Sequence, residues 1–118
     1  ETRVYVRKHV DFPRTPSAND NQYCNLMMQR RRMASRGNCK TINTFVHTAP
    51  GNLIPVCTNQ PDRALRTTGQ RFPVTVCKLI SSKPNCTYRG NRYNHRVQVG
   101  CLGGRPVHLT HATSLTYK

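Results

Sequence analysis

Residues 38–47 read "NCKTINTFVH" and carry the clearest structural signal in the chain. From Thr41 to His47 the residues alternate and are rich in β-prone types, so the stretch predicts a strand. Cys39 can anchor the chain covalently just before this strand, and Lys40 stands between the two. One lysine therefore stands at a defined place in a chain that has lysine and arginine throughout. Its role there has to be inferred from the rest of the sequence.

Further strand patterns fill the second half of the chain. They alternate polar and apolar residues or are rich in β-branched residues. Loops with Gly, Pro and Asn separate them. The predicted strands cover residues 41–47, 71–80, 86–90, 95–101 and 105–110.

Helical patterns are confined to the first half. Asn19 or Asp20 can cap a helix over about residues 21–33, whose apolar residues recur at spacings of three and four. Residues 3–12 are ambiguous, because the valines there fit both the alternation of a strand and the spacing of a helix. A short helix is expected around residues 48–53. Helices first and strands later predict an α+β domain with antiparallel pairing.

Length and charge limit the possible partners. The 118 residues predict a single domain over residues 1–118. The chain has 19 Lys and Arg residues and 4 Asp and Glu residues, which gives a formal net charge of 19 − 4 = +15. Such a surface attracts polyanions, including RNA, DNA, heparan-type glycans and anionic lipid. Charge alone does not choose among them.

The six cysteines are spread along the chain and lack the spacing of a zinc site. An even number of isolated cysteines in a short chain predicts three disulfides in an oxidising compartment. Six cysteines allow many pairings, and the residues alone leave the choice open. No apolar run is long enough for a membrane span, and no apolar leader begins the sequence, so we expect a mature secreted protein.

The residue types present favour histidine chemistry. The four acidic residues are isolated from one another, which argues against a paired-carboxylate glycosidase and a carboxylate-bound two-metal nuclease. Cysteines paired in disulfides cannot act as nucleophiles, and the sequence contains no Gly-x-Ser-x-Gly. Two imidazoles and one cation can cleave RNA, because the ribose 2′-hydroxyl supplies the nucleophile. The five histidines make this possible, and we expect no metal and no cofactor.

Three segments together resemble one protein family. "CKTINTF", residues 39–45, resembles the signature of the pancreatic-type ribonuclease (ribonuclease A) superfamily. "RKHVDF" contains His9 near the N-terminus, and "RPVHLTHATSL" contains His108 near the C-terminus, as the superfamily places its two catalytic histidines. The chain resembles angiogenins and related non-mammalian secreted ribonucleases in particular, because it has six cysteines and carries "QRRRM" at the end of its second predicted helix.

The resemblance implies a fold and a disulfide pattern. The implied fold is α+β, a ribonuclease A-like V-shaped antiparallel sheet with three helices and three disulfides, in which residues 4–11 are helical. The implied pairs are Cys24–Cys77, Cys39–Cys86 and Cys57–Cys101.

The resemblance also implies roles for individual residues. His9 resembles the general base, His108 the general acid, and Lys40 the cation that stabilises the transition state. Thr44 resembles the threonine that selects pyrimidines, and Asn43 the buried asparagine that braces the site. The substrate-contacting or bracing positions are therefore expected to be Lys8, Asn43, Thr44 and Leu109.

Four positions depart from the superfamily pattern. Lys8 replaces a glutamine that touches the phosphate, which keeps a hydrogen-bond donor and adds a charge. Thr110 replaces an aspartate that supports the second histidine, so we expect reduced turnover. Leu102 stands where pancreatic members carry a glutamate for the second base. His111 stands where angiogenins carry a glutamine that obstructs the pyrimidine pocket.

These features predict a secreted, metal-free endoribonuclease that cleaves single-stranded RNA on the 3′ side of pyrimidines through a 2′,3′-cyclic phosphate. We expect a monomer with RNA as its substrate and with an angiogenic or host-defence role. The run Arg30, Arg31, Arg32 resembles the nuclear-targeting segment of angiogenins and can bind polyanions, so nuclear or nucleolar entry after uptake is expected.

An alternative is a cationic binding protein whose catalysis is vestigial. The net charge of +15 favours it, with heparan-type glycans, anionic bacterial membranes or a cell-surface receptor as partners. The intact set of His9, Lys40 and His108 argues against it. Independently of either function, Asn85 begins an Asn-Cys-Thr sequon for N-glycosylation.

Overall fold

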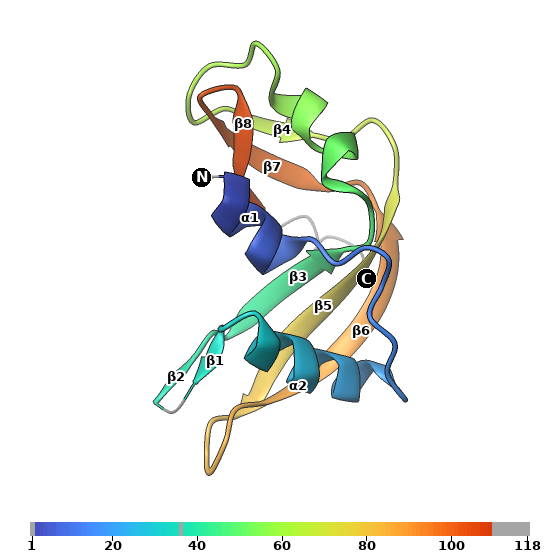
Figure 1. The fold of residues 1–118 in the computed structure, drawn as a ribbon, viewed down its shortest axis with the longest axis vertical. Helices are drawn as coiled ribbons and strands as arrows, with labels where there is room; N and C mark the ends of the chain where they lie inside the picture. Colours follow the sequence, from blue (N-terminus) through green and yellow to red (C-terminus); the bar gives the residue numbers. More distant parts are fainter. Residues whose placement is uncertain (1, 36, 110–118) are drawn as a thin grey trace.

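The structure is a computed structural model of the chain and describes residues 2–35 and 37–109. These residues form two α-helices, two short 3₁₀ helices, a two-stranded hairpin and two three-stranded antiparallel sheets. Figure 1 shows the two larger sheets as diverging arms, with the first helix in the opening between them. The predicted α+β class, with a V-shaped antiparallel arrangement, is confirmed.

The first sheet contains the strand predicted from the opening stretch. β3 (Ile42–Val46) and β6 (Thr87–His95) pair on either side of β5 (Phe72–Ser81). β3 is almost wholly buried, which explains its continuous run of β-prone residues. Each of the three strands was predicted, although β6 extends five residues beyond the predicted range.

The second sheet has the order β4-β7-β8. β7 (Gln98–Leu102) and β8 (Arg105–Leu109) were predicted. β4 (Leu65–Thr67) was not, and neither was the hairpin of β1 (Ala34–Ser35) and β2 (Asn38–Cys39). These three strands have only two or three residues each, too few to show a periodic pattern.

The ambiguous N-terminal segment is a helix. α1 (Thr2–His9) buries Tyr5 and His9, which lie one turn apart on the same face. It ends two residues before the implied boundary, because Val10 leaves the helix and forms an isolated bridge with Val46. This bridge ties the end of α1 to the end of β3.

The second helix begins as predicted. α2 (Asp20–Arg30) is capped by Asn19, whose side chain accepts a hydrogen bond from the amide of Gln22 at 2.8 Å. The helix ends three residues before the predicted boundary, because Arg32 takes a left-handed φ of 66°.

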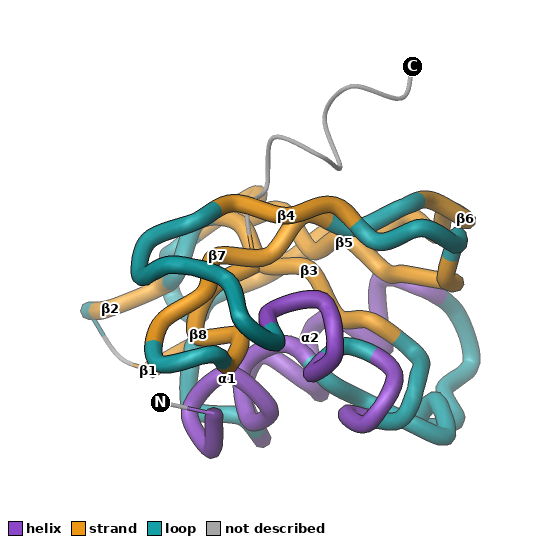
Figure 2. Tube along the Cα trace, turned by 90° about the horizontal axis from the view of Figure 1, so that it is seen from above, coloured by secondary structure: helices purple, strands orange, loops and turns teal. Residues whose placement is uncertain are grey.

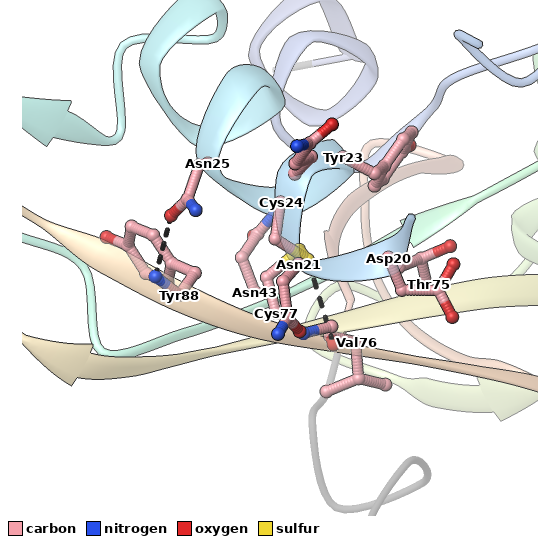
Figure 3. Close-up of a disulfide and its surroundings, with 12 residues drawn as sticks. Asp20, Asn21, Tyr23, Cys24, Asn25, Asn43, Thr75, Val76, Cys77 and Tyr88 are labelled. Atoms are coloured by element: carbon pink, nitrogen blue, oxygen red, sulfur yellow. Dashed lines mark hydrogen bonds between the residues drawn. A yellow bond between two sulfur atoms is a disulfide. The ribbon is translucent and has the colours of Figure 1, made fainter. Parts of the chain in front are cut away.

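α2 lies against the edge strand β6. The side-chain oxygens of Asn25 and Asn21 accept hydrogen bonds from the amides of Tyr88 at 2.7 Å and Gly90 at 2.9 Å. Figure 3 shows Asn25 pointing at the backbone of Tyr88, next to the disulfide that joins α2 to β5. These bonds satisfy amides at the edge of the sheet. Gly90 permits the close approach, since a Cβ there would lie 2.3 Å from the carbonyl oxygen of Asp20.

The third helical segment consists of two 3₁₀ turns, η1 (Pro50–Asn52) and η2 (Ile54–Cys57). The prolines at the start of each turn suit a helix beginning but interrupt a longer helix. The predicted helix at residues 48–53 is therefore shorter and is followed by a second turn. Figure 2 shows the helices gathered on one side of the strands.

Three disulfides link distant parts of the chain, in the pairs that the resemblance implied: Cys24–Cys77, Cys39–Cys86 and Cys57–Cys101. They span 53, 47 and 44 residues. Loops of this length correspond to roughly 4 kcal/mol of loop-closure entropy each, as an upper figure. In the part of the chain that is described, no helix is both long and apolar enough to span a membrane.

Candidate active site

His9 closes α1 and is buried, with 3% of its surface exposed. Its Nδ1 lies 2.9 Å from the carbonyl oxygen of Thr44 on β3. A carbonyl oxygen only accepts hydrogen bonds, so Nδ1 carries the proton and Nε2 is the basic nitrogen of the neutral ring. The arrangement thus orients His9 to take a proton at Nε2.

Lys40 lies between β2 and β3 and is fixed through its backbone. Its amide donates to the carbonyl of Met33 at 3.0 Å, and its carbonyl accepts from the hydroxyl of Tyr88 at 2.8 Å. The disulfide of Cys39 with Cys86 holds the preceding residue. The lysine of the opening stretch is therefore held by Met33, by β6 and by the disulfide of the residue before it.

The Lys40 ammonium is in a partly desolvated, positively charged setting. Burial lowers its pKa from the ordinary value, and the charges of Lys8 and Arg7 lower it further. The charges of Lys8 and Arg7, both on α1, thus act on the Lys40 ammonium. An anion at this place would be stabilised by all three.

Asn43 joins Lys40 to α1. Its amide is fully buried, accepts a hydrogen bond from Lys40 Nζ at 2.9 Å, and donates one to the carbonyl of Lys8 at 2.8 Å. The last residues of α1 and the ammonium group are therefore positioned by one side chain. This placement fits the bracing role that the sequence suggested for Asn43.

His108 comes from the second sheet. It lies on β8, is exposed, and stands opposite Gly100 on β7. A Cβ at Gly100 would lie 3.3 Å from the Cβ of His108, so the glycine leaves room beside the imidazole. α1, which carries His9, packs both against β8, which carries His108, and against β3, which begins two residues after Lys40. Figure 1 shows α1 between these two strands.

Thr44 and Leu109 are both almost fully buried, with 1% of the surface exposed. The backbone of Thr44 orients His9. Leu109 packs in the hydrophobic core with Val99, its partner on β7, and is not presented at an accessible surface. Thr110 and His111, two of the departures from the superfamily pattern, lie outside the described residues.

The arginine run lies at the end of α2 and not beside His108. Arg30 and Arg32 are exposed. Arg31 is only partly exposed, and its guanidinium contacts the end of α1. The three arginines, which are equivalent in the sequence, therefore have different surroundings in the structure.

Two cations on the first sheet were missed by the sequence analysis. Lys78 and Arg89 are exposed and stand directly opposite each other on β5 and β6. Side chains alternate along β5, so Lys78 lies on the same face as Val76, the partner of Thr44. Like charges directly opposite destabilise a sheet, and an anion between them would remove the repulsion. Only the strand register reveals this pair.

A metal site is not evident in the described residues, where no three His, Cys, Asp or Glu side chains come close enough together to hold an ion.

Comparison with known proteins gives a consistent result. The family described as pancreatic ribonuclease matches residues 1–110. An angiogenin of Gallus gallus is 61% identical over 105 residues, which cover 89% of this chain and 76% of the relative. Ribonuclease CL2 of Gallus gallus is 40% identical over 121 residues, covering 96% of this chain and all of the relative. The crystal structure of green turtle egg white ribonuclease superimposes with a TM-score of 0.81 at 36% identity, and covers 92% of this chain and 95% of its own.

Proposed function

Because the chain belongs to the pancreatic ribonuclease family, we propose that it is a secreted endoribonuclease that cleaves single-stranded RNA on the 3′ side of pyrimidines. The observation that carries the proposal is the His9 ring, which the Thr44 carbonyl orients at 2.9 Å on the helix that Asn43 joins to Lys40. The three disulfides fit an extracellular protein.

In the proposed reaction, His9 Nε2 removes the proton from the ribose 2′-hydroxyl. The 2′-oxygen attacks the phosphorus and forms the 2′,3′-cyclic phosphate, while the bond to the 5′-oxygen breaks. His108 donates a proton to that departing oxygen. Lys40 stabilises the charge that builds on the phosphoryl oxygens. Water later opens the cyclic phosphate, with the two histidines in exchanged roles.

The surrounding cations are proposed to hold the neighbouring phosphates. Lys8 and Arg7 lie close enough to Lys40 to lower its pKa, so they add charge at the same place. Lys78 and Arg89 extend the positive surface along the first sheet. Binding should therefore depend steeply on salt.

An oligodeoxynucleotide with a single ribouridine tests this proposal. In the presence of a chelator, we expect cleavage only after the ribouridine, with a cyclic phosphate on the product. The same strand with deoxyuridine should remain intact, because it lacks the 2′-hydroxyl. Intact ribouridine strand after long incubation with wild-type protein would contradict the proposed activity.

A second candidate function follows from the net charge of +15. A cationic protein of this kind can bind heparan-type glycans, anionic bacterial membranes or a cell-surface receptor, and the relative named angiogenin makes an angiogenic role worth testing. Under this candidate, Arg30, Arg31 and Arg32 would supply polyanion binding or nuclear entry. Full bacterial killing or growth promotion by His108→Ala would favour it, and loss of both effects would favour cleavage as the cause.

A further inference from the structure

The guanidinium of Arg31 occupies the C-terminal end of α1. Its Nη1 donates to the carbonyl of Val10 at 2.7 Å and to the carbonyl of Arg7 at 2.8 Å, with the carbonyl of Val6 at 3.4 Å. Its Nη2 lies 3.4 Å from Oδ1 of the buried Asp11. A side chain with this many acceptors is held in place at the end of α1, although 24% of its surface stays exposed.

These bonds complete the cap of α1. The last carbonyls of a helix have no partner within the helix. At the end of α1, the Arg31 guanidinium donates a hydrogen bond to the carbonyl of Arg7, and the Asn43 amide donates one to the carbonyl of Lys8. The positive charge of Arg31 also complements the negative end of the helix dipole. The Arg7 guanidinium in turn donates a hydrogen bond to the carbonyl of Arg31. Each of these two arginines, at the ends of α1 and α2, therefore donates to the backbone of the other.

His9 stands between the two capped positions. Lys8, before it, is held by Asn43, and Val10, after it, is held by Arg31 and by the bridge to Val46. We propose that Arg31 is a positioning residue for the proposed ribonuclease reaction, which fixes the His9 imidazole by capping α1. Small displacements of a catalytic group can lower the rate by about 100-fold. This inference rests on the proposed function.

Arg30 provides a matched control, because it is the preceding residue, carries the same charge and is exposed on α2. We expect Arg31→Gln to lower kcat on the single-ribouridine substrate by about ten- to 100-fold, with KM changed little. Arg30→Gln should leave kcat within about twofold, and any effect should fall on KM and its salt dependence. Arg31→Lys keeps one donor group and the charge, and should recover part of kcat. All rates are measured well below each variant's Tm.

The outcome that overturns the inference is equal behaviour of the two glutamine variants, with KM raised and kcat retained. Arg31 would then act only as a charge for RNA. A lower Tm for Arg31→Gln with unchanged kcat would also overturn it. The NMR titration of the His9 ring supplies a readout that does not need activity. We expect it to shift in Arg31→Gln and not in Arg30→Gln, even if the proposed cleavage itself fails.

A separate observation concerns the connection between β5 and β6. Asn85, the first residue of the sequon, is exposed and is one of the residues that line an open hollow of about 460 Å³. The lining includes neutral amide and hydroxyl side chains that can hydrogen-bond sugar hydroxyls: Asn25, Gln29, Ser35, Ser82 and Thr87. Figure 1 places this loop at the opposite end of the molecule from β8.

We infer that Asn85 carries an N-linked glycan, which the folded protein accommodates because the side chain is exposed beside a polar hollow. In protein secreted from a eukaryotic host, we expect intact mass to exceed that of the polypeptide and to fall after treatment with peptide N-glycosidase. Asn85→Gln and Thr87→Ala should lose the added mass, and Thr87→Ser should keep it. Secreted, fully disulfide-bonded protein with the mass of the bare polypeptide would overturn the inference.

Discussion

The Asn43 amide oxygen accepts a hydrogen bond from the Lys40 ammonium at 2.9 Å, and through this bond β3 positions the cation of the candidate site. The same amide binds the Lys8 carbonyl on α1. One buried side chain thus sets the distance between the cation and the helix that carries His9. Loss of either bond should be visible both in stability and in cleavage.

Asn43→Ala should therefore lower the free energy of unfolding by about 2 kcal/mol, because it removes two hydrogen bonds to partly buried groups, one of them the Lys40 ammonium. The rate of cleavage should fall as well. Urea titration and kcat on the single-ribouridine substrate measure the two effects. Asn94→Ala, an exposed position on β6, is the control and should change neither. Similar stability and kcat for the two variants would show that Asn43 does not brace the candidate site.

Lys8→Gln should alter both RNA binding and the titration of Lys40. Removing one phosphate contact should reduce the slope of log K against log salt by about 0.7 for a single strand. Lys8 also lowers the pKa of Lys40, so its removal should raise that pKa, which an NMR titration of the Lys40 ammonium measures. Lys83→Gln, in the exposed β5–β6 connection, should leave the Lys40 titration in place. An unchanged Lys40 titration in Lys8→Gln would contradict an interaction between the two charges.

His47 should make stability depend on pH. Burial lowers its pKa, and Nδ1 donates to the carbonyl of Asp11 at 2.8 Å while Nε2 accepts from the hydroxyl of Thr75 at 2.8 Å. In the unfolded chain the ring binds a proton near its ordinary pKa of about 6.5, whereas the folded ring does so only at lower pH. Between those two pH values the unfolded state holds more protons, so the free energy of unfolding rises with pH.

We therefore expect stability to fall as the pH is lowered below about 6.5. His47→Gln should flatten this part of the curve. Chemical denaturation at a series of pH values provides the measurement. The lowered pKa of Asp11 acts in the same direction, but in a more acidic window below about 4. Parallel curves for wild type and His47→Gln between pH values of about 5 and 7 would refute the assignment.

Gly100→Ala tests the space beside His108. The new Cβ would lie 3.3 Å from the Cβ of His108 and 3.6 Å from Cδ2 of Leu65, so β8 or the imidazole has to shift by a few tenths of an ångström. We expect kcat to fall several-fold, on the order of what a slight displacement of a catalytic group produces. Gly51→Ala, where no atom lies within 4 Å of the new Cβ, should retain full activity. Equal activity of the two variants would show that Gly100 is not needed for the placement of His108.

The sequence predicts the regular elements well where local signals are strong. The N-cap at Asn19 and the β-prone run of β3 are examples. The residues of the N-terminal segment alone leave it ambiguous because its valines suit two periodicities. Only the resemblance implied the helix, in which Tyr5 and His9 are buried on one face. Strands of two or three residues such as β4 have no periodicity to detect.

The candidate site is harder to predict from residues alone. Nothing local separates His9 and His108 from the other histidines, and only the resemblance to a family singled them out. Arg31 is likewise indistinguishable from its neighbours in an arginine run, because its role depends on carbonyls more than twenty residues away. The pairing of Lys78 with Arg89 depends on strand register, which the sequence does not fix.

The most direct test of the central claim uses a substrate in which sulfur replaces the departing 5′-oxygen. A thiolate leaves without protonation, so this substrate no longer needs a general acid. Loss of a general acid or base typically lowers the rate by about 10²- to 10⁴-fold. We expect His108→Ala to cleave the sulfur substrate almost as fast as wild type, while His9→Ala stays slow on both substrates. Rescue of His9→Ala in place of His108→Ala, or rescue of neither, would contradict the assigned roles.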